Sequence, residues 1–135
     1  MFGRNNNSKP QPKETTLETL IGANTHIKGN ITFSGGMRID GKITGNVLGD
    51  KEGTLLVISE TAQIEGEVHA TQIISNGVII GNVFSYATLE LQTKARIKGD
   101  VHYNKIEMHS GALVSGQMSH DQGNESQVKI ELTEA

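Results

Sequence analysis

The sequence of 135 residues contains no cysteine and no tryptophan, and it has only two prolines. Without cysteine the chain has no disulfide framework, no thiolate metal ligand and no thiol nucleophile, which suits a reducing cytoplasm. No apolar run approaches the ~18–20 residues that a membrane-spanning helix requires. The first residues also lack the apolar stretch and cleavage site of a secretory signal. A chain of this length forms one domain.

Two further absences exclude nucleic-acid and nucleotide binding. Charge is mixed in sign, with a formal net charge of -3 and no block of lysine or arginine, which predicts no nucleic-acid footprint. Ser34-Gly35-Gly36 lacks the Gly-Lys-Ser/Thr that completes a phosphate-binding loop. We therefore expect no nucleotide and no other cofactor.

Aromatic residues are scarce and glycine is abundant, at 4% of the chain and 16 residues respectively. A core of this size normally depends on a few large rings, so here Ile, Val, Leu and Ala must supply the volume by repetition. The pattern apolar–x–Gly–x–apolar does occur six times, in steps of 16, 21, 15, 18 and 17 residues. The long step contains a polar segment at 49–53 that is typical of a loop. The central glycines are Gly29, Gly45, Gly66, Gly81, Gly99 and Gly116.

The repeat predicts a parallel β-helix. Apolar residues alternate within each unit, as in Ile64, Gly66 and Val68, which is the two-residue period of a strand. Units of about 17 residues are too short for a strand plus a helix. Six coils at roughly 4.8 Å spacing make a rod about 25–30 Å long. The glycine either adopts a conformation closed to other residues or lets a neighbour approach closely, and the sequence leaves both open.

The chain divides into a disordered N-terminal tail at 1–16, a β-helix at 17–119 and a disordered, acidic C-terminal tail at 120–135. Nothing at either boundary looks like a capping helix, and an uncapped end exposes strand edges and core to another chain. We therefore predict end-to-end growth, which does not close. The predicted assembly residues are Leu20, Ile21, Ile27, Leu113, Val114 and Met118.

The repeats from about residue 22 to 120, with their Gly-Asn-Ile and Gly-Asp-Val signatures and polar flanks, resemble the bactofilins, a family of bacterial cytoskeletal proteins. The resemblance implies a right-handed β-helix that polymerises through its ends without nucleotide. It also implies peripheral association with the inner face of the cytoplasmic membrane. Family members localise peptidoglycan-remodelling or other envelope proteins and influence cell shape. Many carry a membrane-targeting peptide, which Met1, Phe2 and Arg4 match here.

Histidines are the main candidates for a chemical site. His69 and His102 occupy equivalent places in their repeats, but Phe84 holds that place in the coil between them. Two strand spacings, near 10 Å, separate them too widely to share a metal bound at ~2.0–2.1 Å by each imidazole. We predict solvent-facing histidines and no metal site.

The alternative is a trimeric left-handed β-helix acyltransferase built on hexapeptide repeats. Ile21, Ile27, Phe33 and Ile39 recur every six residues, as that fold requires. The six-residue step does not continue to a third face, however, and the mean unit is nearer 17 than 18 residues. We therefore predict that the chain is not an enzyme. A passive adaptor that never polymerises is a third reading, which the sequence does not separate from a scaffold.

Overall fold

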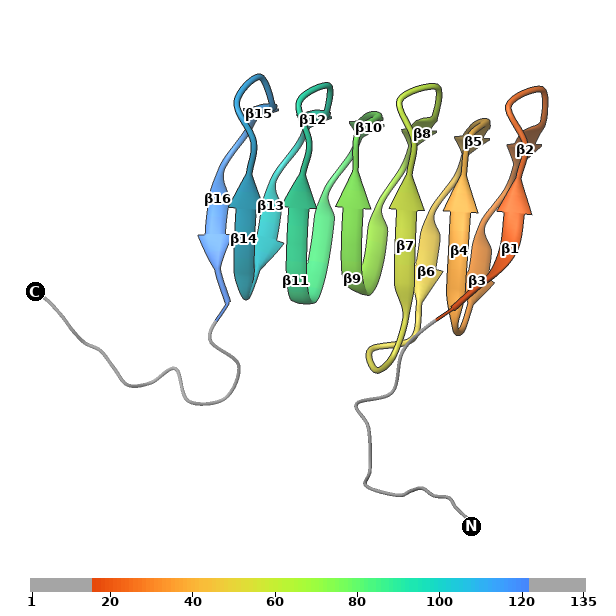
Figure 1. The fold of residues 1–135 in the computed structure, drawn as a ribbon, viewed down its shortest axis with the longest axis horizontal. Coiled ribbons are helices and arrows are strands. Elements are labelled where there is room, and N and C mark those ends of the chain that lie inside the picture. The colour runs from red at the N-terminus through yellow and green to blue at the C-terminus, as the bar shows by residue number, and fades with distance from the viewer. Residues whose placement is uncertain (1–15, 122–135) are drawn as a thin grey trace, which may run out of the picture.

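The computed structural model of the protein describes residues 16–121, and all regular structure in that range is β-strand. The strands wind into a rod of six coils, each with three sides (Figure 1). The chain runs up the front of the rod, crosses at the top and descends at the back while it advances from right to left. This is a right-handed coil, so the predicted right-handed parallel β-helix is confirmed.

The first face is the front of the rod in Figure 1, and its neighbouring strands pair in parallel from coil to coil. β9 and β11 are longer than the rest because each continues around a corner from the third face onto the first. The first face comprises β1 (Leu17–Ile21), β4 (Gly36–Ile39), β7 (Leu55–Ile58), the second halves of β9 (Val68–Ser75) and β11 (Val83–Leu91), and β14 (Lys105–Met108).

The second face is a sheet of six three-residue strands, labelled along the top of Figure 1. The third face lies behind the first. The second face comprises β2 (His26–Lys28), β5 (Lys42–Thr44), β8 (Gln63–Glu65), β10 (Val78–Ile80), β12 (Arg96–Lys98) and β15 (Leu113–Ser115). The third comprises β3 (Ile31–Phe33), β6 (Val47–Gly49), the first halves of β9 and β11, β13 (Val101–Tyr103) and β16 (Met118–His120).

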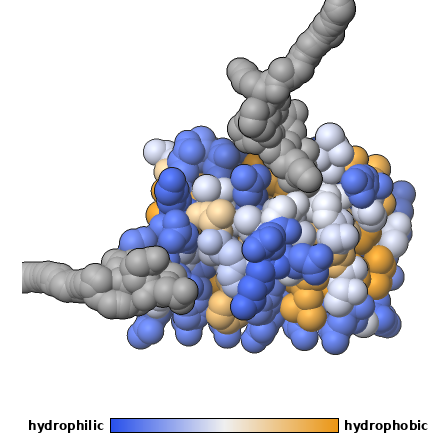
Figure 2. All heavy atoms as spheres, turned by 90° about the horizontal axis from the view of Figure 1, so that it is seen from below, coloured by the Kyte–Doolittle hydropathy of each residue, from blue (hydrophilic) through white to orange (hydrophobic). Residues whose placement is uncertain are grey.

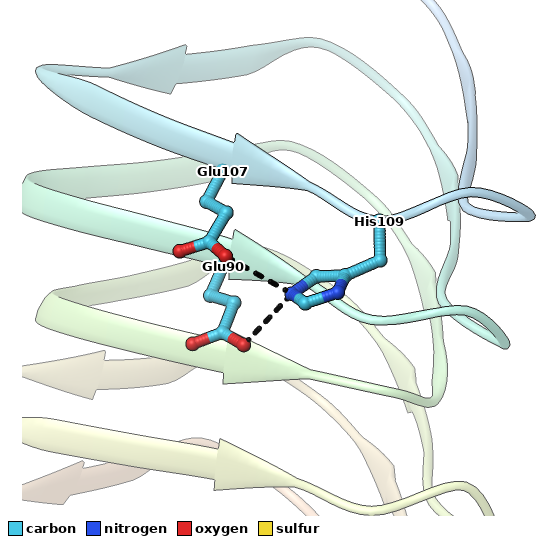
Figure 3. A group of neighbouring side chains, drawn as sticks. All are labelled: Glu90, Glu107 and His109. Carbon is cyan, nitrogen blue, oxygen red and sulfur yellow. Dashed lines mark hydrogen bonds and ion pairs between the residues drawn. The ribbon is translucent and has the colours of Figure 1, made fainter.

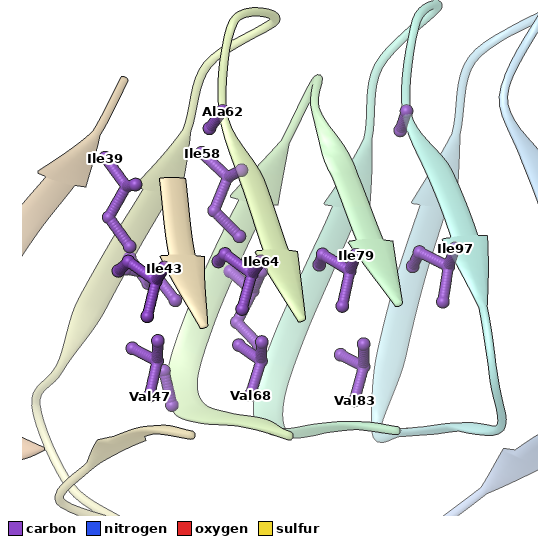
Figure 4. Packing of buried hydrophobic residues seen from close by; sticks show 14 of the residues in the cluster. Ile39, Ile43, Val47, Ile58, Ala62, Ile64, Val68, Ile79, Val83 and Ile97 are labelled. Carbon is purple, nitrogen blue, oxygen red and sulfur yellow. The ribbon is translucent and has the colours of Figure 1, made fainter. Parts of the chain in front are cut away.

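The core consists of straight rows of aliphatic side chains, one residue per coil. Figure 4 shows Ile43, Ile64, Ile79 and Ile97 aligned along the rod, and each is at most 1% exposed. Parallel pairing places equivalent residues directly over one another, so each side chain packs on its copies in the adjacent coils. Burying one such side chain fully stabilises the fold by about 1.5–3 kcal/mol. Stacked aliphatics fill this narrow interior, which explains the scarcity of aromatic residues.

The repeat glycines serve both purposes that the sequence left open. Gly81 has φ +149°, a conformation that side chains rarely adopt. A Cβ atom there would also lie 2.1 Å from the carbonyl oxygen of Gly66, one coil earlier. Close coil-to-coil contact and backbone conformation therefore both require glycine.

The strands begin at Leu17 and end at His120, which belongs to β16. The C-terminal boundary predicted from the sequence thus falls one residue before the last strand ends. The predicted tails otherwise lie outside the described residues, apart from Thr16 and Asp121. Between β6 and β7, residues 50–54 form the loop expected at the long repeat. Within the described range no helix is long and apolar enough to cross a membrane.

Candidate assembly surfaces and side-chain clusters

The first coil exposes the N-terminal end of the apolar core. In the row of the second face, Ile43, Ile64 and Ile79 are 0% exposed, whereas Ile27 in the first coil is only half-buried. Ile31 starts the corresponding row of the third face and is also half-buried. The predicted assembly residue Ile27 therefore lies where the core meets solvent. Ile21 belongs to the same coil and is 7% exposed.

The last coil exposes the core at the opposite end. Val101 is fully buried, but Met118, its parallel partner in the last coil, is 39% exposed. Val114 ends the row that begins at Ile27 and is half-buried. Met108 ends a row of the first face and is 43% exposed. The two predicted residues Val114 and Met118 thus terminate inward rows, as Ile21 and Ile27 do at the other end.

Leu20 and Leu113 also lie in the terminal coils, but their side chains point outward from the sides of the rod. Leu20 pairs with Arg38 and is 63% exposed, and Leu113 pairs with Arg96 and is 56% exposed. Two-residue alternation places both opposite to the inward rows. Figure 2, a view from below, shows hydrophobic residues toward the right-hand end, where the first coils lie.

Open hydrogen-bonding groups accompany the exposed core. In the interior, the backbone N–H of Gly99 donates to the carbonyl of Ser115 at 3.0 Å, one coil further on. The N–H of Gly116, the equivalent glycine of the last coil, has no partner within residues 16–121. Unpaired edges of this kind are templates for another strand.

The first coil contains an aromatic residue that sequence reasoning did not assign to the end. Phe33 is the last residue of β3 and is half-buried, and its ring lies over Gly49 in the next coil. A Cβ atom on Gly49 would be 2.8 Å from the ring atom Cζ of Phe33. The sequence does contain a sign of this contact. Gly49 occupies the row that holds Ala70 in the following coil, and a missing side chain there leaves room for the ring of Phe33.

The first face also holds a cluster of two carboxylates and an imidazole (Figure 3). The ring atom Nε2 of His109 lies 3.0 Å from a carboxylate oxygen of Glu90 and 3.3 Å from one of Glu107. The three atoms that could ligate a metal, one from each residue, lie within 4.8 Å of one another. The Nε2 amide of Gln92 lies 3.3 Å from Glu90. These contacts account for the positions of the side chains without an ion. Sequence reasoning missed the cluster, although Glu90 and Glu107 are one repeat apart.

The third face carries a stack of rings. Phe84 lies between His69 and His102, with ring centroids 4.4 and 4.6 Å away. The predicted separation of the two histidines by Phe84 is therefore confirmed. The hydroxyl of Tyr86 lies 2.8 Å from Nδ1 of His69. Burial and then the nearby charge of Glu67 raise the pKa of Tyr86, so the phenol stays protonated and available for this hydrogen bond.

The residues predicted for membrane targeting, Met1, Phe2 and Arg4, lie outside the described residues.

Comparison with known proteins identifies the family. The family model for bactofilins, described as polymer-forming cytoskeletal, matches residues 19–119, which is nearly the whole β-helix. This chain belongs to the bactofilin family. It is 27% identical over 114 residues to the bactofilin BacO of Myxococcus xanthus, covering 83% of this chain and 88% of that protein. It is 22% identical over 100 residues to the bactofilin BacP of the same organism. No solved structure matches.

The second match covers 74% of this chain but only 40% of BacP, so the chain spans well under half of that relative. Family membership makes the chain a polymer-forming cytoskeletal scaffold protein. Because this is a structural family, the match also favours the scaffold interpretation over the acyltransferase alternative.

Proposed function

We propose that this bactofilin polymerises end to end, without nucleotide, through the open faces of its first and last coils. The observation that carries the proposal is the change in burial along each inward row. In one row of the third face, Val68 and Val83 are fully buried in the middle of the rod. The same row ends in the half-buried Ile31 in the first coil and the exposed Met118 in the last. Stacking another molecule on either end would bury these side chains as interior coils are buried.

The energetics of such a joint follow from the interior. Each aliphatic side chain removed from water contributes about 25 cal/mol per Å² of apolar area, and strand pairing satisfies open groups such as the N–H of Gly116. A nearest-neighbour rod needs no nucleotide for this reaction, since each joint repeats the contacts between coils. Joints at the ends leave all three faces of the rod free.

Electron microscopy of the full-length protein without nucleotide tests the proposal. Filaments are expected for the natural sequence, and small particles for Val114→Arg, which places a charge at the end of an inward row. Val57→Arg is the matched control, because Val57 points outward and pairs with Arg38 in the preceding coil. Met118→Arg repeats the test at an exposed position, in case Val114→Arg unfolds. Filaments from both end variants, or uniform monomers or trimers from the natural protein, would refute end-to-end polymerisation.

We further propose that the filaments associate with the inner face of the cytoplasmic membrane through Met1, Phe2 and Arg4. There they would hold peptidoglycan-remodelling or other envelope proteins and so influence cell shape. One phenylalanine and a few cations make a weak anchor, at about 1 kcal/mol per basic residue. A filament multiplies that affinity by presenting many copies. Loss of membrane localisation in Phe2→Ser cells that still form filaments would support the anchor, whereas unchanged localisation would exclude it.

A further inference from the structure

The second face of the rod concentrates positive charge, although the chain as a whole is acidic. The outward positions of its six strands hold Lys28, Lys42, Arg96 and Lys98, against the single carboxylate of Glu65. The whole chain has a formal net charge of -3. The fold therefore sorts charge by face, which gives the second face a positive local field.

Most of this positive charge is not neutralised within the rod. Lys28, Arg96 and Lys98 are exposed and have no carboxylate within ion-pair distance among residues 16–121. Arg96 instead donates from Nη1 to the carbonyl oxygens of Ala95 and Gly111, each at 2.9 Å. Lys42 and Glu65 form the one ion pair between outward residues of this face in the described part of the chain, at 3.7 Å.

Exposed aliphatic side chains lie among these cations. Ile80 is 38% exposed and pairs with Lys98 in the next coil. Leu113 is 56% exposed and pairs with Arg96. Apolar and cationic side chains are therefore neighbours in adjacent coils toward the C-terminal end of this face. Mixed surfaces of this kind bind the boundary between headgroups and acyl chains, where lysine and arginine meet lipid phosphates and aliphatic groups enter the apolar layer.

The shape of the second face favours a flat partner. Its six strands have three residues each and pair in register from end to end. At roughly 4.8 Å per strand they make a flat strip about 25 Å long. The outward positions include no Phe, Tyr or Trp on which bases could stack, so the strip lacks a feature typical of single-stranded nucleic-acid sites.

We propose that the second face binds anionic lipid headgroups, so that each rod lies on the membrane along this face. The inference rests on the proposed membrane association and assigns part of it to Lys28, Arg96, Lys98, Ile80 and Leu113. End-to-end joints leave the side faces uncovered, and every subunit of a filament would present the same strip. Many weak contacts would then act together.

Co-sedimentation with phosphatidylcholine vesicles, with and without phosphatidylglycerol, tests the proposal. The full-length chain carries Val114→Arg in this assay, so that filaments do not form and the affinity of a single rod is measured. Removing a cation near an anionic surface weakens binding roughly fivefold. Arg96→Gln/Lys98→Gln should therefore weaken binding to phosphatidylglycerol vesicles about 25-fold. The matched control Lys51→Gln/Lys105→Gln changes net charge equally on other surfaces and should have a much smaller effect. Unchanged circular dichroism must accompany each variant.

Lys28→Gln/Lys98→Gln spares the backbone hydrogen bonds of Arg96 and should reproduce the loss. Leu113→Ser should weaken binding while leaving charge unchanged. Equal losses in the control and test variants would overturn the proposal, because binding would then follow net charge alone. Stronger, Lys98-dependent binding to duplex DNA than to vesicles would also overturn it.

The design separates the second face from the N-terminal anchor. Loss of binding in Phe2→Ser together with full binding in Arg96→Gln/Lys98→Gln would refute the second face and leave the anchor standing. The reverse result would refute the anchor and support the second face. No binding by the natural filament to either vesicle would refute both.

Discussion

Replacing Gly81 by alanine tests whether close packing between coils stabilises the rod. Gly81 has φ +149°, and an added Cβ would lie 2.1 Å from the carbonyl oxygen and 2.6 Å from the carbonyl carbon of Gly66. Both atoms are backbone, so no side chain can rotate away. Ordinary C···O contacts are about 3.3–3.6 Å, so the two coils must separate by about 1 Å.

Two costs follow. Holding alanine at this φ costs about 1–3 kcal/mol. Separating these two coils also stretches the hydrogen bonds between them, such as that from the Gly66 N–H to the Ile80 carbonyl, 2.9 Å in length. Losing two or three of these, at about 0.5–1.5 kcal/mol each, adds roughly 1–4 kcal/mol. The sum of about 2–7 kcal/mol is a large part of the ~5–15 kcal/mol that stabilises a typical domain.

Gly29→Ala is the matched control. Gly29 occupies the same place in the first coil and has φ +133°, but an added Cβ would have nothing within 4 Å. It therefore carries the conformational cost alone. We expect urea unfolding, followed by circular dichroism in a Val114→Arg background without filaments, to give a loss of about 1–3 kcal/mol for Gly29→Ala and a distinctly larger loss for Gly81→Ala. Equal losses would refute the role of close approach.

Three further predictions concern the core and the surface. Ile64→Ala should destabilise the rod by about 2–5 kcal/mol in the same urea assay, because Ile64 is fully buried between two copies of itself; a smaller loss would indicate a collapsible core. A hydrogen bond from Ser59, together with the hydrogen bond and charge of Arg38, lowers the pKa of Asp40 from its usual 3.8, although burial acts in the opposite direction. The ionised carboxylate therefore stabilises the fold above pH 3.8, and this contribution is lost as the pH falls through the lowered pKa. Asp40→Asn should therefore flatten the acid limb of a stability–pH curve, and an unchanged limb would contradict this. Glu107→Gln should change stability by at most about 1 kcal/mol, since its contact with His109 is exposed; a larger thermal shift would indicate a more important cluster.

The interior of the rod was predictable because each inward position is repeated in six coils under the same constraint. Ile43, Ile64 and Ile79 are aligned in sequence by the glycine repeat and aligned in space by parallel pairing. The third face was harder to recognise. Beside the hydrophobic row from Ile31 to Met118, it has a second inward row that includes Gly49, Ala70 and Ser85, which share a small volume rather than hydrophobicity. Hydrophobic periodicity alone does not detect such a row.

The glycine repeat alone did not predict whether the terminal leucines point into the core or out to solvent. The sequence predicts Leu20 and Leu113 as assembly residues, together with Ile21, Ile27, Val114 and Met118, because they are apolar and lie close to the ends. Register settles their orientation: each occupies a row in which a neighbouring coil has arginine. The same register could have separated Ile27 from its outward neighbours, since one-residue steps reverse the side of a strand.

The ends of the rod differ from its interior in a way that bears on assembly. Inward rows carry compact residues in the middle, such as Val68 and Ala70, which are fully buried. The corresponding end positions carry Met118 in the last coil and Phe33 in the first. Larger side chains cover more of the open core in a single molecule, and methionine adapts readily to a new surface. A rod with ends of this composition can remain folded alone and still bury its terminal side chains when another molecule stacks against it.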